Sequence, residues 1–301
     1  MSTPRITSSM ISRGVLTDLN DVSTRMAQTQ RKMSSGKEIT RPSDDPFGTG
    51  RALGLRTELD GIGQYRRNTT DAEGWTAATD SALRTIGEVT QTARELLLRG
   101  ANGTLTATER GQIANQIDQL IGTAKEAGNT FFQGRALFAG TATTTKPYGT
   151  PSDAYLGDAG DIVRSIGPGI AVIVNARGSD VLGDGTDGKL LDTLRDVAAH
   201  LRGGSAADLA ALSGGDLVAI DRSFDDVLTA QAQIGSIANR LETADDRLSE
   251  LELNAKTLLS QTEDADMAAT IVDYSMQQSV YQSALRAGAG IVQVSLMDFL
   301  R

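Results

Sequence analysis

The stretch IDRSFDDVLTAQAQIGSIANRLETADDRLSELELNAKTL, residues 220–258, decides the fold. Two rows of apolar or small residues run through it: Ile220, Val227, Ile234, Leu241, Leu248 and Ala255 in the first, and Ala230, Ile237, Ala244, Leu251 and Leu258 in the second. Alternating steps of three and four residues place both rows on one helical face, which is the pattern of a coiled-coil seam. The stretch therefore predicts a long helix over residues 216–261 that another helix must cover.

A similar row lies near the start of the chain, in a helix predicted over residues 9–35. Its members are Ile11, Val15, Leu19, Val22, Met26 and Met33. The charges of the two ends are complementary, because residues 1–70 hold 11 basic and 7 acidic side chains and residues 221–266 hold 4 basic and 11 acidic ones. Opposite charges favour neighbouring helices. We expect the N-terminal helix to lie beside the C-terminal one.

The segments between these ends predict further helices and a small β-rich part. Gly36 is a natural stop for the first helix, and Asp44 or Asp45 can cap a second helix that starts at Pro46 and reaches about residue 99. Thr106 and Glu109 form a capping-box pattern before a third helix that ends near residue 128. Residues 131–138 predict a β-hairpin and residues 170–174 a strand. We expect helix again at 190–201 and from Ser205, a break at Gly214-Gly215, and a last helix starting at 263–266.

A third apolar row occupies the last helix. It consists of Met267, Ile271, Tyr274, Tyr281, Leu285, Val292 and Phe299. Such a row can be ordinary core packing within one chain. However, Arg286 is the one charged residue between Asp273 and Asp298, and so uncharged a helix needs cover from partners. We favour packing between subunits, with this row and the N-terminal row as the contact residues.

Composition excludes several classes of function. The net charge of −9 argues against nucleic acid as a partner. With no cysteine and one histidine, disulfides, zinc–thiolate sites, thiol catalysis and Ser-His triads are not expected. Asp44-Asp45 and Asp264 with Asp266 fit helix starts better than a carboxylate pair or a metal site, and residues 183–188 fit a tight turn better than a calcium loop. We therefore predict no catalytic residues, no metal and no cofactor. An N-terminus without an apolar core and the lack of a stretch of ~20 apolar residues favour a protein that neither uses a secretory signal peptide nor inserts into a membrane.

Several motifs, in order along the chain, resemble one family. The segment MSSGKEI at 33–39 resembles a conserved L-S-S-G-x-x-I run of the flagellin-like axial proteins of the bacterial flagellum. Four further segments resemble the hook-associated branch of that family more than filament flagellins: RPSDDP at 41–46, QYRRN at 64–68, LFAGT at 137–141 with PY at 147–148 and YLGD at 155–158, and SLMDFL at 295–300.

The resemblance implies a mainly α fold: an elongated, flagellin-like helical bundle with paired N- and C-terminal coiled-coil helices and a small β-rich insertion. We expect a terminal coiled-coil domain of 1–45 plus 260–301 that is disordered in the monomer. A helical rod of 46–140 plus 189–259 and an outer insertion of 141–188 complete the predicted organisation.

The function implied is structural and not enzymatic. The resemblance implies export by the flagellar type III apparatus, with a chaperone on the C-terminal helix. It also implies a homo-oligomeric ring at the extracellular junction of hook and filament, between a second hook-junction protein and flagellin. A filament flagellin is the alternative within the family. A cytoplasmic coiled-coil adaptor is the alternative outside it, and a secreted enzyme using the β insertion is a weaker third.

Overall fold

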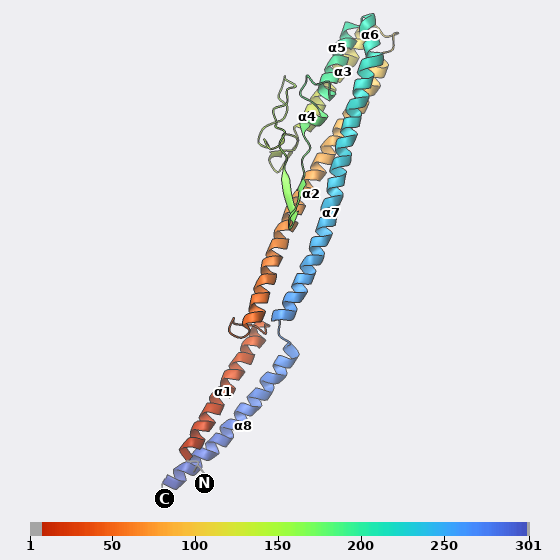
Figure 1. Cartoon of the computed structure of the whole chain (residues 1–301). Helices are drawn as coiled ribbons and strands as arrows, with labels where there is room; N and C mark the ends of the chain where they lie inside the picture. Colours follow the sequence, from red (N-terminus) through yellow and green to blue (C-terminus); the bar gives the residue numbers. More distant parts are fainter. Residues whose placement is uncertain (1–7, 300–301) are drawn as a thin grey trace. The chain divides into compact units, whose positions relative to one another are not determined.

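The computed structural model describes residues 8–299, and most of them are helical (Figure 1). In chain order the helices are α1 (Ser8–Ser35), α2 (Pro46–Gly100), α3 (Ala107–Gly128), α4 (Gly178–Val181), α5 (Leu190–Gly203), α6 (Ala206–Ala211), the π-helical turn η1 (Leu212–Asp216), α7 (Leu217–Glu263) and α8 (Met267–Phe299). The strands are β1 (Phe131–Phe132), β2 (Arg135–Ala136), β3 (Val163–Gly167) and β4 (Ile170–Ile173). The predicted mainly α class with a small β-rich insertion is confirmed.

The chain forms two compact units. One combines Met1–Gly61 with Leu251–Arg301, and the other is Ile62–Glu250. Helices α2 and α7 each contribute residues to both units. The predicted three-part organisation, and the disorder of the ends in the monomer, stay predictions.

Helix α7 buries its seam as predicted, but its partner is not the N-terminal helix. The first row, Ile220, Val227, Ile234, Leu241, Leu248 and Ala255, is buried throughout. Helix α2 supplies the opposite face: a Cβ on its Gly87 would lie 3.6 Å from the Cγ1 atom of Val227. The predicted pairing of the N- and C-terminal helices is found between α1 and α8; α1 does not cover the seam of α7, to which the charges of residues 221–266 had pointed.

Basic residues of 1–70 do pair with acidic residues of α7, but they lie on α2 and in the loop before it and not on the predicted N-terminal helix. In the unit Ile62–Glu250, Arg66 Nε lies 3.2 Å from Asp245 Oδ1 and Arg94 Nε lies 2.6 Å from Asp221 Oδ1. In the other unit, Arg56 Nη2 lies 2.6 Å from Glu263 Oε2. These arginines lie on α2 at the edges of its contact with α7, where partly exposed ion pairs add little energy but favour one register.

Two of the predicted helix starts are confirmed in detail. Thr106 accepts the N–H of Glu109 and the carboxylate of Glu109 accepts the N–H of Thr106, which completes the capping box of α3. Ser205 and Asp208 form the same box at the start of α6. In both cases the side chains satisfy backbone N–H groups that the first helical turn leaves without partners.

The break predicted at Gly214-Gly215 is wrong. Residues 212–216 widen into the π-helical turn η1, and the helix runs on through α6, η1 and α7. Leu212 is fully buried, and the Asp216 carboxylate lies 2.7 Å from His200 Nδ1 of α5. These two anchors, one on each side of the glycines, hold the backbone in the helical path despite the low helix propensity of glycine.

The β-rich segment packs on α2 and contains one strand that the sequence did not predict. The hairpin β1–β2 lies within the predicted 131–138, and β4 within 170–174. Strand β3, which pairs antiparallel with β4 through a bulge after Ser165, was missed. Trp75 of α2 is 2% exposed and meets the Phe132 ring edge-on, with centroids 6.2 Å apart.

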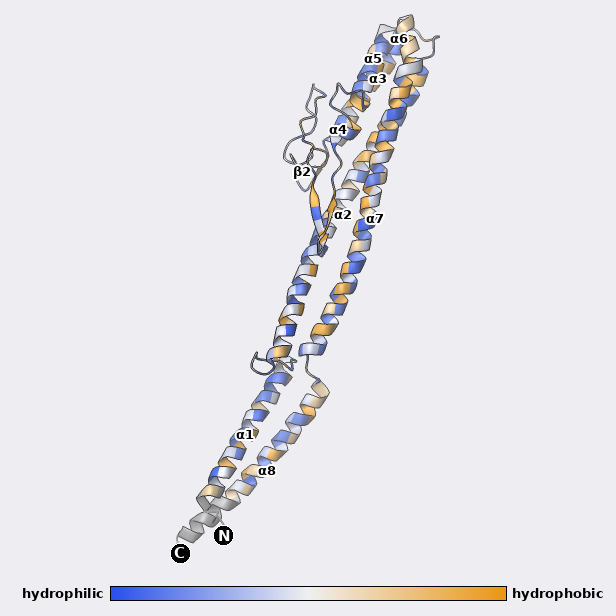
Figure 2. Cartoon of the chain, viewed as in Figure 1, coloured by the Kyte–Doolittle hydropathy of each residue, from blue (hydrophilic) through white to orange (hydrophobic). Residues whose placement is uncertain are grey.

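In the unit that contains both terminal helices, α1 and α8 run antiparallel beside each other, and the start of α1 lies close to the end of α8 (Figure 1). Figure 2 shows that α8 is paler and more orange than α1, in keeping with its few charges. Across residues 8–299, no helix combines the length and apolarity that a membrane crossing requires.

Candidate functional site

Helix α8 carries two different apolar faces. Met267, Ile271 and Leu285 of the predicted contact row are exposed at 39%, 50% and 46%. Three neighbours that the row omitted are as exposed or more so: Val272, Met276 and Val280. They recur every four residues, which places them along one side of the helix. We call Val272, Met276 and Val280 the α8 outer face. Met267, Ile271 and Leu285 lie on another side of the helix, along the edge of its contact with α1, and among the described residues nothing buries either group.

The second face of α8 lies against α1 and contains the two tyrosines of the predicted row. Tyr274 and Tyr281 are half-buried, and they share a three-four spacing with Thr270, Gln277 and Gly288. Gln277 Oε1 accepts a hydrogen bond of 3.1 Å from Thr29 Oγ1 of α1. The predicted row therefore stays within one stripe of the helix: its tyrosines turn toward α1, and Met267, Ile271 and Leu285 lie along the exposed edge of that contact.

The N-terminal row belongs to the inner contact with α8. Val22 is buried, and Val15, Leu19 and Met26 are half-buried. A Cβ on Gly288 would lie 3.1 Å from Val15 Cγ1, so glycine at this position permits the close approach of the two helices. The side chains of Ile11, Val292 and Phe299 lie outside the described side chains.

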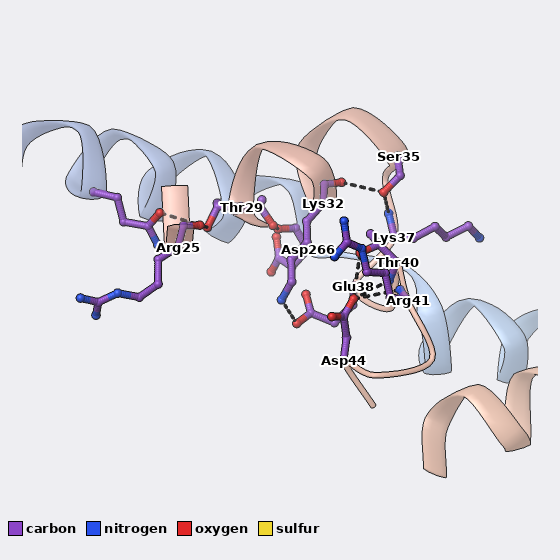
Figure 3. Close-up of polar contacts among 12 residues, drawn as sticks. Arg25, Thr29, Lys32, Ser35, Lys37, Glu38, Thr40, Arg41, Asp44 and Asp266 are labelled. Carbon is purple, nitrogen blue, oxygen red and sulfur yellow. Dashed lines mark hydrogen bonds and ion pairs between the residues drawn. The ribbon is translucent and has the colours of Figure 1, made fainter. Parts of the chain in front are cut away.

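A polar joint connects the segment after α1 to the link between α7 and α8. Figure 3 shows the polar contacts within the end of α1 and the loop that follows it, among them Ser35 with Lys32 and Lys37. Its backbone is a one-residue antiparallel bridge between Lys37 and Asp264. Glu38 N donates to Glu263 O at 2.7 Å, and Ala265 N donates to Gly36 O at 3.0 Å. Gly36 has a φ of +68°, a left-handed conformation that favours glycine and turns the chain out of α1.

Four charged side chains close this joint. The Glu263 carboxylate, with only 7% of its side chain exposed, lies 3.0 Å from Lys37 Nζ and 2.6 Å from Arg56 Nη2. Lys37 also reaches Asp264 Oδ1 at 2.6 Å. Two cations thus face two carboxylates. No local pattern predicts this pairing, because Lys37 and Glu263 are separated by 226 residues. The joint, with the α8 outer face, is the candidate site.

The pKa values follow from this arrangement. Hydrogen bonds to Asp264 and then Glu263 raise the pKa of Lys37. Burial raises the pKa of Glu263, but hydrogen bonds from Arg56 and Lys37 outweigh it, so that the pKa is below its ordinary value. Hydrogen bonds from Lys37 and Ser260 lower the pKa of Asp264. Lys37, Glu263 and Asp264 are therefore held in their charged forms near neutral pH.

The other acidic residues discussed in the sequence analysis accept hydrogen bonds from backbone N–H groups. Asp45 caps α2 by accepting the N–H groups of Phe47 and Gly48 at 3.1 and 3.0 Å. Asp44 instead closes the preceding loop, where hydrogen bonds from Thr40 and Arg41 lower its pKa. Asp266 caps α8 by accepting the N–H of Ala268 at 2.9 Å.

Within the described part of the chain, no cluster of three or more His, Cys, Asp or Glu side chains is arranged to hold a metal ion. The 183–188 segment is the turn that was predicted, since Asp184 Oδ1 accepts the N–H of Thr186 at 2.9 Å. The features that remain are packing surfaces and structural ion pairs.

Comparison with known proteins identifies the family. A family model described as the bacterial flagellin N-terminal helical region matches residues 6–143, and the bacterial flagellin C-terminal helical region matches residues 217–300. The chain belongs to the flagellin family. Members of this family are structural proteins of the extracellular flagellum and not enzymes, and the same holds for this chain.

Within the flagellin family, the chain is similar to hook-associated members. It is 28% identical over 290 residues to flagellar hook-associated protein 3 of Escherichia coli (strain K12), covering 89% of this chain and 90% of that protein. A flagellin of Bacillus subtilis (strain 168) is 27% identical over 302 residues, covering 95% and 97%. The solved structure of a putative flagellar hook-associated protein from Vibrio parahaemolyticus has a TM-score of 0.68 at 26% identity and covers 73% of this chain and 100% of that one.

Proposed function

We propose that this flagellin-family chain is the hook-associated protein that forms the junction between the flagellar hook and the filament. The α8 outer face carries the proposal. With Met267, Ile271 and Leu285 on another side, helix α8 exposes six large apolar side chains and has one charged residue between Asp273 and Asp298. A surface of this kind is typical of a subunit that packs against neighbours. The similarity to flagellar hook-associated protein 3 supports the position at the hook.

The partners proposed follow from this position. Copies of the chain pack with one another, with a neighbouring hook-junction protein on the hook side, and with flagellin on the filament side. Before assembly the α8 outer face needs temporary cover, which a dedicated export chaperone supplies while the chain waits for the flagellar type III apparatus. The terminal helices complete their folding when neighbouring subunits bury this face.

Deletion of the gene tests the proposal. Loss of a junction protein leaves the hooks in place and lets unpolymerised flagellin leak into the medium. Loss of a filament flagellin instead removes filament protein itself, and loss of a cytoplasmic adaptor leaves filaments intact. Either of the last two outcomes contradicts the proposal. The flagellin alternative retains one argument in its favour, which is the 27% identity to the Bacillus subtilis flagellin.

A further inference from the structure

Phe47, at the start of α2, is the most exposed large apolar side chain that the structure describes, at 84%. The turn beneath it is held by hydrogen bonds. Asp45 accepts the N–H groups of both Phe47 and Gly48, and proline at position 46 restricts the first helical backbone angle. Gly48 is buried, and a Cβ there would lie 2.6 Å from Ile39 Cδ1, so the loop packs closely behind the ring. A constrained turn thus holds an aromatic side chain out toward solvent. Aromatic side chains held in this way are typical anchors of protein–protein contacts, because little further ordering is needed on binding.

The same unit carries a groove that suits an aromatic ring. It has a volume of about 580 Å³ and lies along the end of α1 and the following loop, lined by Ala27, Gln30, Arg31, Ser34, Ser35 and Thr40. It is an open groove and not an enclosed cavity, so an aromatic ring in it would lie against its wall with one face toward solvent. The Nε atom of Arg31 is buried and has no hydrogen-bond partner among the described residues. An arginine side chain of this kind can stack its guanidinium on an aromatic face.

We propose that Phe47 of one copy inserts into the Arg31 groove of a neighbouring copy and stacks on its guanidinium. The inference rests on the proposed function, because it requires copies of the chain to lie side by side. Phe47 and the groove are different surfaces of the same chain. A contact between them is therefore heterologous and can repeat from copy to copy, as a ring or helical assembly requires.

Site-directed crosslinking tests the contact directly, since the natural chain has no cysteine. Full-length chains with Phe47→Cys and with Ser34→Cys are expressed together in place of the natural chain, and isolated flagella are treated with a short bismaleimide. We expect a crosslinked dimer that neither variant gives alone. Phe47→Cys combined with Thr57→Cys, an exposed position on α2, is the matched control and should give none.

Substitutions test the stacking. Phe47→Ala and Arg31→Gln should each lower the amount of the chain in isolated flagella by about tenfold, whereas Phe47→Tyr should keep it close to the natural level. Normal helix content of the purified variants shows that they fold. If the groove instead binds an acidic side chain of another protein, Arg31→Gln should lower the amount of the chain in flagella and Phe47→Ala should not. That result overturns the inference.

The failures of the two proposals can be told apart. If the natural chain is found in isolated flagella but the 47–34 crosslink does not form, the Phe47 contact is wrong and the proposed function stands. If the natural chain is absent from flagella, the proposed function fails and the contact fails with it.

Discussion

Glu263 is the residue on which the joint depends. Its carboxylate is almost buried and binds two cations whose side chains are 40% and 53% exposed. An unpaired charge at this depth is unfavourable, so each of the three side chains limits where the other two can lie. The joint thus fixes the end of α7 to the loop after α1.

Replacing Glu263 with Gln should destabilise this unit by about 1–2 kcal/mol, a modest value because both cations reach solvent. Hydrogen exchange of the amides of residues 36–40 and 263–266 measures the effect, which should be faster exchange. Asp246→Asn, at an exposed position of α7, is the control and should change little. Equal protection in both variants would contradict a structural role for Glu263.

Glu263 also predicts how the stability of the joint depends on pH. Because the pKa of Glu263 lies below its ordinary value of 4.5, its charged form stabilises the fold above that pH. That stability is lost as the pH falls through the folded pKa. Between pH 7 and pH 3, the natural chain should therefore lose more protection at the joint than Glu263→Gln does. Parallel losses in the two proteins would refute this assignment.

His200 predicts the opposite dependence at the end of α5. Its hydrogen bond to Asp216 raises its pKa above the ordinary value of 6.5. The protonated form then stabilises η1 fully below pH 6.5, and this contribution is lost as the pH rises through the folded pKa. Amides of residues 206–217 should exchange faster, relative to intrinsic rates, above that pKa. In His200→Gln this step should be absent; its persistence would assign it to another group.

At the scale of the elements, substitutions on the outer face of α8 should change incorporation into flagella without unfolding the isolated chain. Met276→Asp with Val280→Asp places charges on the outer face, where both residues are exposed. The isolated chain should lose only about 1 kcal/mol, from the lower helix propensity of Asp and the repulsion between carboxylates four residues apart. Incorporation into flagella, measured by quantitative immunoblotting, should be lost. Gln278→Asp, also exposed on α8, is the control for added charge. Normal incorporation of the double variant would show that this face makes no intersubunit contact.

The glycines of α2 predict a second case in which the stability of the chain and its incorporation into flagella change independently. A Cβ on Gly50 or Gly54 would have no described atom within 4 Å, so no packing within the chain requires glycine there. Alanine at both positions should stabilise the chain by about 0.5–1 kcal/mol each in urea unfolding. If this glycine surface of α2 packs against a neighbouring subunit, the amount of the alanine variant incorporated into flagella should fall. Gly122→Ala on α3, also in open space, should stabilise without that loss.

Local patterns predicted the elements well and their partners less well. The Thr106 and Ser205 caps and the α7 seam depend on residues close in sequence, so spacing alone found them. The partner of α7 could not be read in this way, because α1 and α2 both offer apolar rows and basic residues. Val272, Met276 and Val280 could have been found from their four-residue spacing. The Lys37–Glu263 pair had no local signal at all.

At the scale of the whole molecule, assembly should change the order of the ends. We expect the amides of α1 and α8 to exchange quickly in the free chain and slowly in isolated flagella, since neighbours then bury the α8 outer face. The buried core of the unit Ile62–Glu250 should be protected in both states. Strong protection of α1 and α8 in the free chain would contradict folding on assembly.

Trp75 is the single tryptophan of the chain, and it is buried against Phe132 within Ile62–Glu250. Its fluorescence therefore reports whether that unit is folded and does not report on the helices at the chain ends. Circular dichroism records all helices together. Followed side by side during heating, the two signals would reveal in the unmodified protein whether the ends melt before the rest.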